Sequence, residues 1–242
     1  RGGRSRVLVT GGGAGIGRGI ARAFAEAGDH VTIAGRRAAA LRETDDGRGM
    51  TCVTADITDE AAVDALFAQP FDVVIANAGT GRAAPLAEVS LDEWNATLAI
   101  NLTGTFLTFR AALRDMSDGG RLIAIASTQA LTGGRRNAAY SASKLGVLGL
   151  GRSVAHEVAR LCITCNAICP GFVDTPMADA AVKGVMQSRG LDEDAARKMV
   201  VSKNPIGRLI TIEEVASAAL YLASPGAAMV NGHALSLSGG EI

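Results

Sequence analysis

Short apolar runs alternate with longer amphipathic segments along the whole chain. A run of about five apolar residues is typical of a strand buried on both faces, whereas apolar residues that recur every three or four positions are typical of a helix. Strands are predicted on this basis at 6–10, 30–34, 51–55, 72–76, 121–126, 162–168 and 234–237. Helices are predicted at 16–27, 59–69, 91–116, 138–161 and 212–222.

The regular exchange of strand and helix patterns defines the expected fold class. Apolar strands separated by helices form a parallel sheet that is covered on both faces. We therefore expect an α/β fold with a single doubly wound, Rossmann-type parallel sheet and helices on both faces. Residues 1–242 are expected to form one domain, since 242 residues of which 48% are hydrophobic can build one large core. The segment 173–209 lacks a clear strand pattern and is predicted to be a substrate lid of short amphipathic helices.

Charge and chain composition exclude several classes of protein. The 24 Lys and Arg residues balance the 24 Asp and Glu residues, so the chain has no net field that would attract nucleic acid or an anionic membrane surface. The apolar runs are too short to span a membrane, and the first residues do not resemble a secretory signal. A cytoplasmic protein is therefore expected.

Three closely spaced cysteines raise the question of a metal site. Cys162, Cys165 and Cys169 fall in an apolar run before Pro170 that is predicted to be a buried strand, and no second Cys or His pair stands at ligand spacing. Free cysteine is among the most buried residue types. We therefore expect structural cysteines and no metal.

A glycine-rich turn follows the first predicted strand and opens the first predicted helix. Its spacing is Gly11-x-x-x-Gly15-x-Gly17, which differs from the common Gly-x-Gly-x-x-Gly dinucleotide fingerprint. Glycines let the backbone turn tightly and approach a pyrophosphate, which then lies against the N–H groups at the start of the helix. A purely structural turn is the alternative, but the strand before it and the helix after it favour nucleotide binding.

Tyr140 and Lys144 lie four residues apart in a predicted helix and therefore on the same face of it. A free phenol has a pKa of about 10, which makes it a poor acid or base at neutral pH. A neighbouring ammonium group favours the phenolate and lowers this pKa towards the range in which acid–base catalysis is efficient. Such pairs are common on helices, so this pair alone is weak evidence for a catalytic site. Ser127, at the end of an apolar run upstream, and the glycine turn strengthen that interpretation.

Together these motifs resemble those of the short-chain dehydrogenase/reductase family, in particular its 3-oxoacyl-reductase-like members. The resemblance covers nearly the whole chain and depends on the order and spacing of motifs that are weak individually. They are the glycine turn, Asn77-Ala-Gly79, Asn101, Ser127, Tyr140 with Lys144, Pro170-Gly171, Thr175 and the closing Ser236-Leu-Ser-Gly-Gly240.

The resemblance implies catalytic roles for Asn101, Ser127, Tyr140 and Lys144. Tyr140 would be the general acid in carbonyl reduction and the base in alcohol oxidation, while Ser127 would donate a hydrogen bond to the substrate oxygen. Lys144 would bind the nicotinamide ribose and lower the pKa of Tyr140, and Asn101 would hold a water that links Lys144 to solvent. Substrate would be contacted by Ser127, Tyr140 and Gln129, the last as a polar handle in an otherwise apolar pocket. Each residue taken singly has a structural alternative, such as a strand-end cap for Ser127.

The resemblance also implies which residues bind the dinucleotide. Asp56 would contact the adenine and Ile57 would pack on its ring, although a cap for the helix that begins near Asp59 is the alternative for Asp56. Thr175 would bond the carboxamide, and Val173 would do so through its backbone. The full set is Gly11, Gly15, Ile16, Gly17, Arg36, Asp56, Ile57, Asn77, Ala78, Gly79, Tyr140, Lys144, Pro170, Gly171, Val173 and Thr175.

The end of the second predicted strand bears on the choice between NADP and NAD. An acidic residue there bonds the ribose 2′-hydroxyl of NAD, whereas an arginine accommodates the 2′-phosphate of NADP. Gly35 holds the acidic position and Arg36-Arg37 follows, so we expect an NADP(H) preference carried chiefly by Arg36, with NAD as the alternative. Ala14 occupies a position that is basic in some NADP-using relatives, and a solvated arginine pair is the other interpretation.

The expected activity is NAD(P)-dependent hydride transfer between nicotinamide and a carbonyl/secondary alcohol pair. A lyase or epimerase of the same family and a non-catalytic, dinucleotide-sensing protein are the alternatives. The expected substrate is a small ketone, an alcohol or an acyl thioester. Arg135-Arg136, just ahead of Tyr140, would suit a phosphate-bearing acyl-CoA or form only a solvated loop. The resemblance further implies a homotetramer or homodimer in which helices 91–116 and 138–161 pack across two-fold axes.

Overall fold

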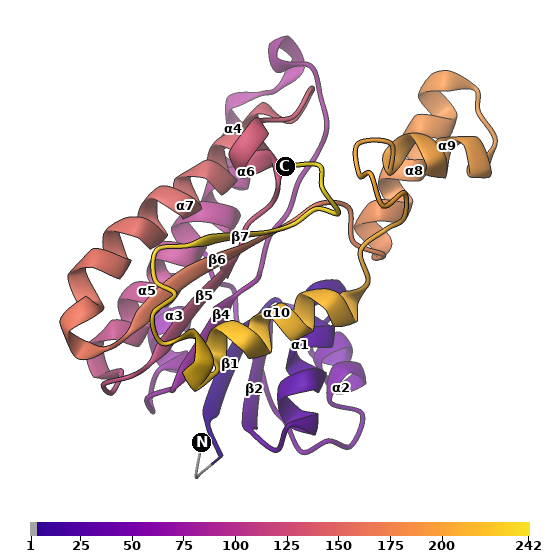
Figure 1. Cartoon of the computed structure of the whole chain (residues 1–242). Helices are drawn as coiled ribbons and strands as arrows, with labels where there is room; N and C mark the ends of the chain where they lie inside the picture. The colour runs from indigo at the N-terminus through magenta and orange to yellow at the C-terminus, as the bar shows by residue number, and fades with distance from the viewer. Residues whose placement is uncertain (1–3) are drawn as a thin grey trace.

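Seven parallel strands form one sheet in the computed structural model, which describes residues 4–242 (Figure 1). The strand order is β3-β2-β1-β4-β5-β6-β7, so the winding of the chain reverses between β1 and β4. The strands are β1 Arg6–Thr10, β2 His30–Gly35, β3 Thr51–Thr54, β4 Val73–Ala76, β5 Arg121–Ile125, β6 Thr164–Pro170 and β7 Ala234–Leu237.

Helices cover both faces of this sheet. Figure 1 shows α1, α2 and α10 on one face and α3, α5 and α7 on the other. The helices are α1 Gly15–Glu26, α2 Ala38–Asp45, α3 Glu60–Leu66, α4 Leu91–Leu98, α5 Gly104–Asp115, α6 Gln129–Thr132, α7 Ala138–Val158, α8 Pro176–Arg189, α9 Glu193–Val200 and α10 Ile212–Ala223. The doubly wound α/β fold expected from the sequence is thereby confirmed.

The two cores follow from the alternation of side chains along each strand. Val7 and Val9 of β1 pack with Ile20 of α1 on one face, whereas Leu8 packs with Phe109 of α5 on the other. Each such side chain is fully or almost fully buried, and burying it contributes about 1.5–3 kcal/mol to the free energy of unfolding. A strand that is apolar at every position is therefore stable only between two helical layers, which is why this pattern predicted the fold.

Two sequence-based predictions about local structure are wrong. The helix predicted at 91–116 is not continuous, because a π-helical turn at Ala99–Thr103 separates α4 from α5. Cys162 lies outside β6, is exposed and has a left-handed backbone with a φ of 55°, whereas Cys165 and Cys169 are buried as expected. A further helix, α2, was not predicted, since its eight residues are too few for a clear periodic pattern.

The segment predicted as a lid contains two amphipathic helices, α8 and α9. They pack on each other through Val182, Ala196 and Val200 and lie beyond the ends of the strands in Figure 1. A parallel bridge between Val173 and Ile210 joins the beginning and the end of this segment at the sheet. Movement of these helices over a bound substrate stays a prediction. Within residues 4–242, no helix combines the length and apolar character that crossing a membrane requires.

The contact between α1 and α10 gives a test of the packing. A Cβ atom added at Gly19 of α1 would lie 1.9 Å from Cγ2 of Ile212 on α10. We expect Gly19→Ala to lower the free energy of unfolding by about 1–3 kcal/mol, because the two helices must separate to accept the methyl group. Denaturant unfolding measures this change. Gly184→Ala on α8, where a Cβ has nothing within 4 Å, is the matched control and should be neutral or slightly stabilising. Equal stability of wild type and Gly19→Ala would contradict the close packing.

Candidate active site

Ser127 and Tyr140 meet beyond the carboxyl end of β5. Ser127 follows that strand by two residues, and Tyr140 lies in the first turn of α7. The two side chains are hydrogen-bonded to each other, and the Ser127 hydroxyl also accepts the N–H of Gln129 at 3.2 Å. The helix start therefore brings the phenol to the strand end that carries the serine.

Lys144 lies one turn further along α7 and is buried with its ammonium group. Its Nζ donates a hydrogen bond of 2.7 Å to the carbonyl oxygen of Ile125, the last residue of β5. The same Nζ lies 5.8 Å from the centroid of the Tyr140 ring. Burial lowers the pKa of Lys144 to about 8, although the nearby thiol of Cys169 opposes this shift.

The pKa of Tyr140 departs from the sequence-based expectation. Burial raises the pKa of this phenol above its usual value, and the hydrogen bond with Ser127 only partly opposes the rise. The expected lowering of the pKa by Lys144 is therefore wrong for the chain by itself. The physical reason is that burial removes the phenolate from water, and this effect outweighs the lowering by the hydrogen bond with Ser127.

Asn101 comes close to Lys144 from the π-helical turn. Its carboxamide oxygen accepts the N–H of Thr80 at 2.8 Å, and its nitrogen donates to the Thr80 carbonyl at 2.8 Å and to Ser143 Oγ at 2.9 Å. The position that a Cβ would take on Gly79 lies 3.3 Å from Lys144 Nζ and 3.4 Å from Asn101 Oδ1. Lys144 and Asn101 therefore border the same space beside Gly79.

The glycine turn has the geometry that a pyrophosphate needs. Gly11 and Gly15 have left-handed backbones, with φ values of 66° and 51°, and a Cβ on Gly17 would lie 2.3 Å from the carbonyl oxygen of Gly11. The N-cap residue Ala14 makes no side-chain capping bond, and the first turn of α1 contains no acidic residue. The N–H groups at the start of this helix are therefore not engaged by a side-chain cap, which fits a bound phosphate group.

Asn77 and Ala78 support the glycine turn from the end of β4. The Asn77 amide nitrogen donates to the carbonyl oxygens of Thr10 and Gly11 at 3.0 and 3.2 Å. A Cβ on Gly11 would lie 2.8 Å from Cα of Ala78. Asn77 and Ala78 thus follow β4 directly and adjoin the glycine turn, and the Asn77 side chain holds that turn.

Arg36, Asp56 and Ile57 lie beyond the ends of β2 and β3. Arg36 is exposed and lies near enough to Asp56 to contribute to lowering the pKa of that carboxyl, although hydrogen bonds from Thr58 are the main cause. Asp56 does not cap α3, because Asp59 accepts the N–H groups of the first turn. Ile57 is buried against α3 and α5. Ile16, at the other end of the glycine turn, is half-buried against the core.

The segment after β6 approaches the glycine turn from the other side. The side chain of Thr175 is the nearest group to Gly15, at 3.5 Å from the position of a Cβ there. Thr175 Oγ1 donates to the carbonyl oxygen of the buried residue Val173 at 3.1 Å. Pro170 and Gly171 connect this segment to β6, and their backbone is bonded to Thr128 and Leu237.

The turn before α7 borders Tyr140. The carbonyl oxygen of Arg136 accepts the N–H of Ala84 at 2.7 Å, and Gly81, three residues before Ala84, lies against the Tyr140 ring. Arg135 and Arg136 are exposed in this turn. Gln129 lies against Gly134, and its Oε1 accepts a hydrogen bond of 3.3 Å from Ser141.

Three residues of this site were not singled out from the sequence. Thr10 accepts N–H groups of Asn77 with its hydroxyl and its carbonyl oxygen, Ser143 joins Asn101 to α7, and Cys169 lies against Ser127 and Lys144. Burial raises the pKa of Cys169 to about 11, so its thiol stays protonated. Ser143 is adjacent to Lys144 in sequence, but only the tertiary structure reveals its partner on another helix.

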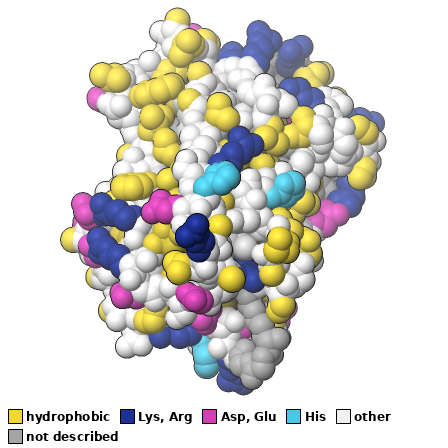
Figure 2. All heavy atoms as spheres, turned by 60° about the vertical axis from the view of Figure 1, so that its left-hand side comes forward, with side chains coloured by type: hydrophobic (Ala, Val, Ile, Leu, Met, Phe, Trp, Pro, Cys, Tyr) yellow, Lys and Arg dark blue, Asp and Glu magenta, His cyan; other side chains and the backbone are white. Residues whose placement is uncertain are grey.

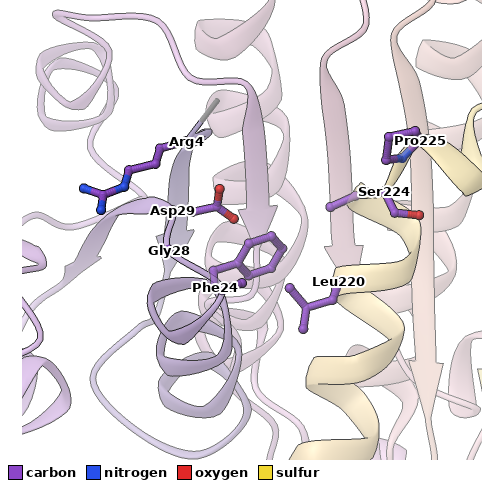
Figure 3. A pocket seen from close by; sticks show the side chains of 9 residues that line it. Arg4, Phe24, Gly28, Asp29, Leu220, Ser224 and Pro225 are labelled. Carbon is purple, nitrogen blue, oxygen red and sulfur yellow. The ribbon is translucent and has the colours of Figure 1, made fainter. Parts of the chain in front are cut away.

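A separate cavity of about 410 Å³ lies at the opposite end of the strands. Figure 3 shows Phe24 of α1 and Leu220 of α10 facing it, with Asp29 and Ser224 at its border. None of the predicted site residues lines it. Among residues 4–242, no group of three or more His, Cys, Asp or Glu side chains is placed to hold a metal ion.

Comparison with known proteins identifies relatives over almost the full length of the chain. The family model described as Enoyl-(Acyl carrier protein) reductase matches residues 11–241. D-beta-hydroxybutyrate dehydrogenase from Cupriavidus necator is 35% identical over 250 residues, which cover 98% of this chain and 97% of the relative. D-threitol dehydrogenase from Mycolicibacterium smegmatis is 38% identical over 247 residues, which cover 97% of this chain and 91% of the relative.

A solved structure agrees with these sequence relatives. A crystal structure of a variant actinorhodin polyketide ketoreductase with NADPH superposes with a TM-score of 0.92, at 35% sequence identity, and covers 98% of this chain and 97% of the other. Similarity of this extent in both sequence and fold agrees with the motif order found in the sequence. It shows that the chain belongs to the short-chain dehydrogenase/reductase family of NAD(P)-dependent oxidoreductases.

Proposed function

We propose that the chain interconverts a carbonyl compound and a secondary alcohol by NADP(H)-dependent hydride transfer, with Tyr140 as the general acid and base. The observation that carries this proposal is the contact of the Tyr140 phenol with Ser127, one helical turn from the buried ammonium of Lys144. A bound nicotinamide would supply or accept the hydride. The side chains of this chain have to place the substrate oxygen and move one proton.

The proton and the hydrogen bonds are divided among these side chains. During reduction, Tyr140 Oη gives its proton to the carbonyl oxygen, while Ser127 Oγ donates a hydrogen bond that stabilises the negative charge developing there. During oxidation, Tyr140 takes the proton of the alcohol. Lys144 binds the nicotinamide ribose, and Asn101 holds a water that returns the proton from Lys144 to solvent. The space bordered by Lys144 Nζ, Asn101 Oδ1 and the Asn77 carbonyl oxygen beside Gly79 supports this relay, because all three are polar atoms.

The proposed cofactor site runs from the glycine turn to the end of β2. The N–H groups at the start of α1 receive the pyrophosphate, and Arg36 binds the 2′-phosphate of NADP as a forked, charged donor. Asp56 contacts the adenine, Ile57 packs beside its ring, and Thr175 and Val173 bind the carboxamide. NAD is the alternative cofactor.

The substrate is proposed to be a small hydroxy or keto compound. Relatives of this chain are named for hydroxybutyrate, threitol and ketoacyl substrates, so the family accommodates both charged and neutral molecules. An acyl thioester is the narrower proposal, in which Arg135 and Arg136 beside the Tyr140 pocket bind an anionic group. Gln129 lies between this turn and α7, where it can contact the substrate.

We also propose that the protein forms a homotetramer or homodimer through the face that carries α4, α5 and α7. Leu91, Phe106 and Leu145 on these helices are 72%, 41% and 55% exposed. Figure 2 shows hydrophobic side chains spread across this side of the molecule among separate charged residues. Exposed apolar side chains on neighbouring helices favour a two-fold contact between copies.

The four cysteines are all free, and free thiols are typical of proteins in the reducing cytosol. They support the proposal of a cytoplasmic location.

Replacing the phenol tests the proposed acid. We expect Tyr140→Phe to lower kcat at least ~100-fold, because the ring remains but the proton donor is lost. NADPH absorbance is followed with β-ketoacyl thioesters, cyclic ketones and polyols, and cofactor affinity is measured by NADPH fluorescence. The affinity should be almost unchanged. Turnover of the variant at the wild-type rate would show that Tyr140 is not the acid, and wild-type protein without turnover on any carbonyl or alcohol would favour the lyase or sensor alternatives.

A methyl group on Gly79 tests the proton relay. Gly79→Ala places a Cβ between Lys144 Nζ and Asn101 Oδ1, where it occupies the proposed water position. We expect kcat to fall about 10-fold or more, in the range of general acid–base effects, with little change in KM for the cofactor. Gly226→Ala is the control and should leave kcat unchanged, because Gly226 lies outside the site and the nearest atom to a Cβ there is Ser224 Oγ at 3.5 Å. Normal kcat in Gly79→Ala would argue against a relay through this space.

Charge reversal at Arg36 tests the cofactor preference. Wild-type protein should have a higher kcat/KM with NADPH than with NADH. Arg36→Asp should reverse this ratio by at least ~10-fold, since a carboxylate repels the 2′-phosphate and accepts the ribose 2′-hydroxyl. Arg42→Asp, on α2, is the control for a general change of charge. A wild type that prefers NADH would overturn the preference, and an Arg36→Asp variant with unaltered selectivity would overturn its proposed cause.

A further inference from the structure

Ser143 is a fully buried residue of α7 whose hydroxyl has a partner on each side. Its Oγ donates to the carbonyl oxygen of Tyr140 at 2.7 Å and accepts from Nδ2 of Asn101 at 2.9 Å. A serine hydroxyl has one proton to donate, and here that proton is engaged by Tyr140. Ser143 Oγ therefore presents a lone pair to Asn101 and acts towards it only as an acceptor.

The carboxamide of Asn101 is held in one orientation by three hydrogen bonds. Thr80 offers one N–H and one carbonyl oxygen, which bind Oδ1 and Nδ2 respectively, each at 2.8 Å. The second hydrogen of Nδ2 has Ser143 Oγ as its acceptor. Rotation of the amide by 180° would place Oδ1 against the Thr80 carbonyl oxygen and Ser143 Oγ, and Nδ2 against the Thr80 N–H. All three hydrogen bonds would then be lost.

This orientation decides which atom of Asn101 faces Lys144. Oδ1 borders the space beside Gly79, where Lys144 Nζ is the other near neighbour. An oxygen there stabilises an ammonium group or a water bound to it, whereas an N–H₂ group would repel the ammonium. Tyr140 on α7 and Cys169 on β6 are the titratable groups near Lys144, and neither holds Asn101.

We propose that Ser143 is a positioning residue of the active site, which holds the Asn101 carboxamide with its oxygen towards Lys144 and ties that carboxamide to the turn of α7 carrying Tyr140. The inference rests on the proposed function, in which Tyr140, Lys144 and Asn101 act together. It explains why the junction between α4 and α5 is a π-helical turn, since the widened turn brings Asn101 within reach of both Thr80 and Ser143.

Ser143→Ala removes the acceptor for Asn101 Nδ2 and also the hydrogen bond that Oγ donates to the Tyr140 carbonyl oxygen. One N–H of a fully buried amide then loses its partner, and the amide has to turn or admit water. We expect kcat to fall about 10-fold while KM for the cofactor changes less than about 2-fold, because no cofactor contact is altered. Ser153→Ala is the matched control, since Ser153 lies on the same helix and donates only to Gly149 at 3.1 Å on the exposed side.

A double-mutant cycle separates positioning from general destabilisation. If Ser143 acts through Asn101, the Ser143→Ala, Asn101→Ala double variant should have the same kcat as Asn101→Ala alone. Additive losses would overturn the inference, as would a Ser143→Ala variant with wild-type kcat.

A readout without turnover distinguishes this inference from the proposed function. The titration of Lys144 can be followed by NMR in protein labelled at lysine Cε, and the pKa of Lys144 should fall below its wild-type value in Ser143→Ala but not in Ser153→Ala. Absence of turnover in wild type would contradict the proposed function alone. An unchanged Lys144 titration in Ser143→Ala would contradict the positioning role alone.

Discussion

The burial of the Lys144 ammonium group is the constraint on which the rest of the site depends. An ammonium removed from water is costly unless protein groups replace the water, and the cost appears here as a pKa lowered to about 8. The Ile125 carbonyl meets part of this need with a bond of 2.7 Å. This bond fixes Lys144 at the end of β5, and the position of Tyr140 one turn earlier on α7 follows from it.

The parallel sheet explains why residues so far apart in sequence share one site. The carboxyl ends of β1, β4, β5 and β6 lie at the same edge because all seven strands are parallel. The glycine turn, Asn77, Ser127 and Gly171 each follow one of these strands directly or within two residues. The reversal of winding between β1 and β4 separates the helices at this edge, which is where a doubly wound sheet binds its ligand.

Helix α7 and the π-helical turn complete the site from the other layer. Ser143 and Lys144 are neighbours in sequence, yet one accepts from Asn101 and the other donates to Ile125. Close approach at Gly79 and Gly81 keeps space around Lys144 and Tyr140, since a Cβ at either position would lie within 3.3 Å of these side chains. Glycines in this part of the chain therefore shape the pocket rather than relax the backbone.

Apolar patterning by itself determined the seven strands and the two helical layers, and the glycine, polar and aromatic residues between the strands supplied the order of the motifs. These features depend on local alternation and on burial, which the sequence states directly. The sequence also placed Tyr140 and Lys144 on one helix face, because helical spacing needs no tertiary information. The π-helical turn, the exposed position of Cys162 and the raised pKa of Tyr140 were decided by the tertiary structure. Each of these features depends on which group, distant in sequence, forms a hydrogen bond with the residue or excludes water from it. The hydrogen bond between the Ser143 hydroxyl and Asn101 is a further example, since its two partners lie 42 residues apart.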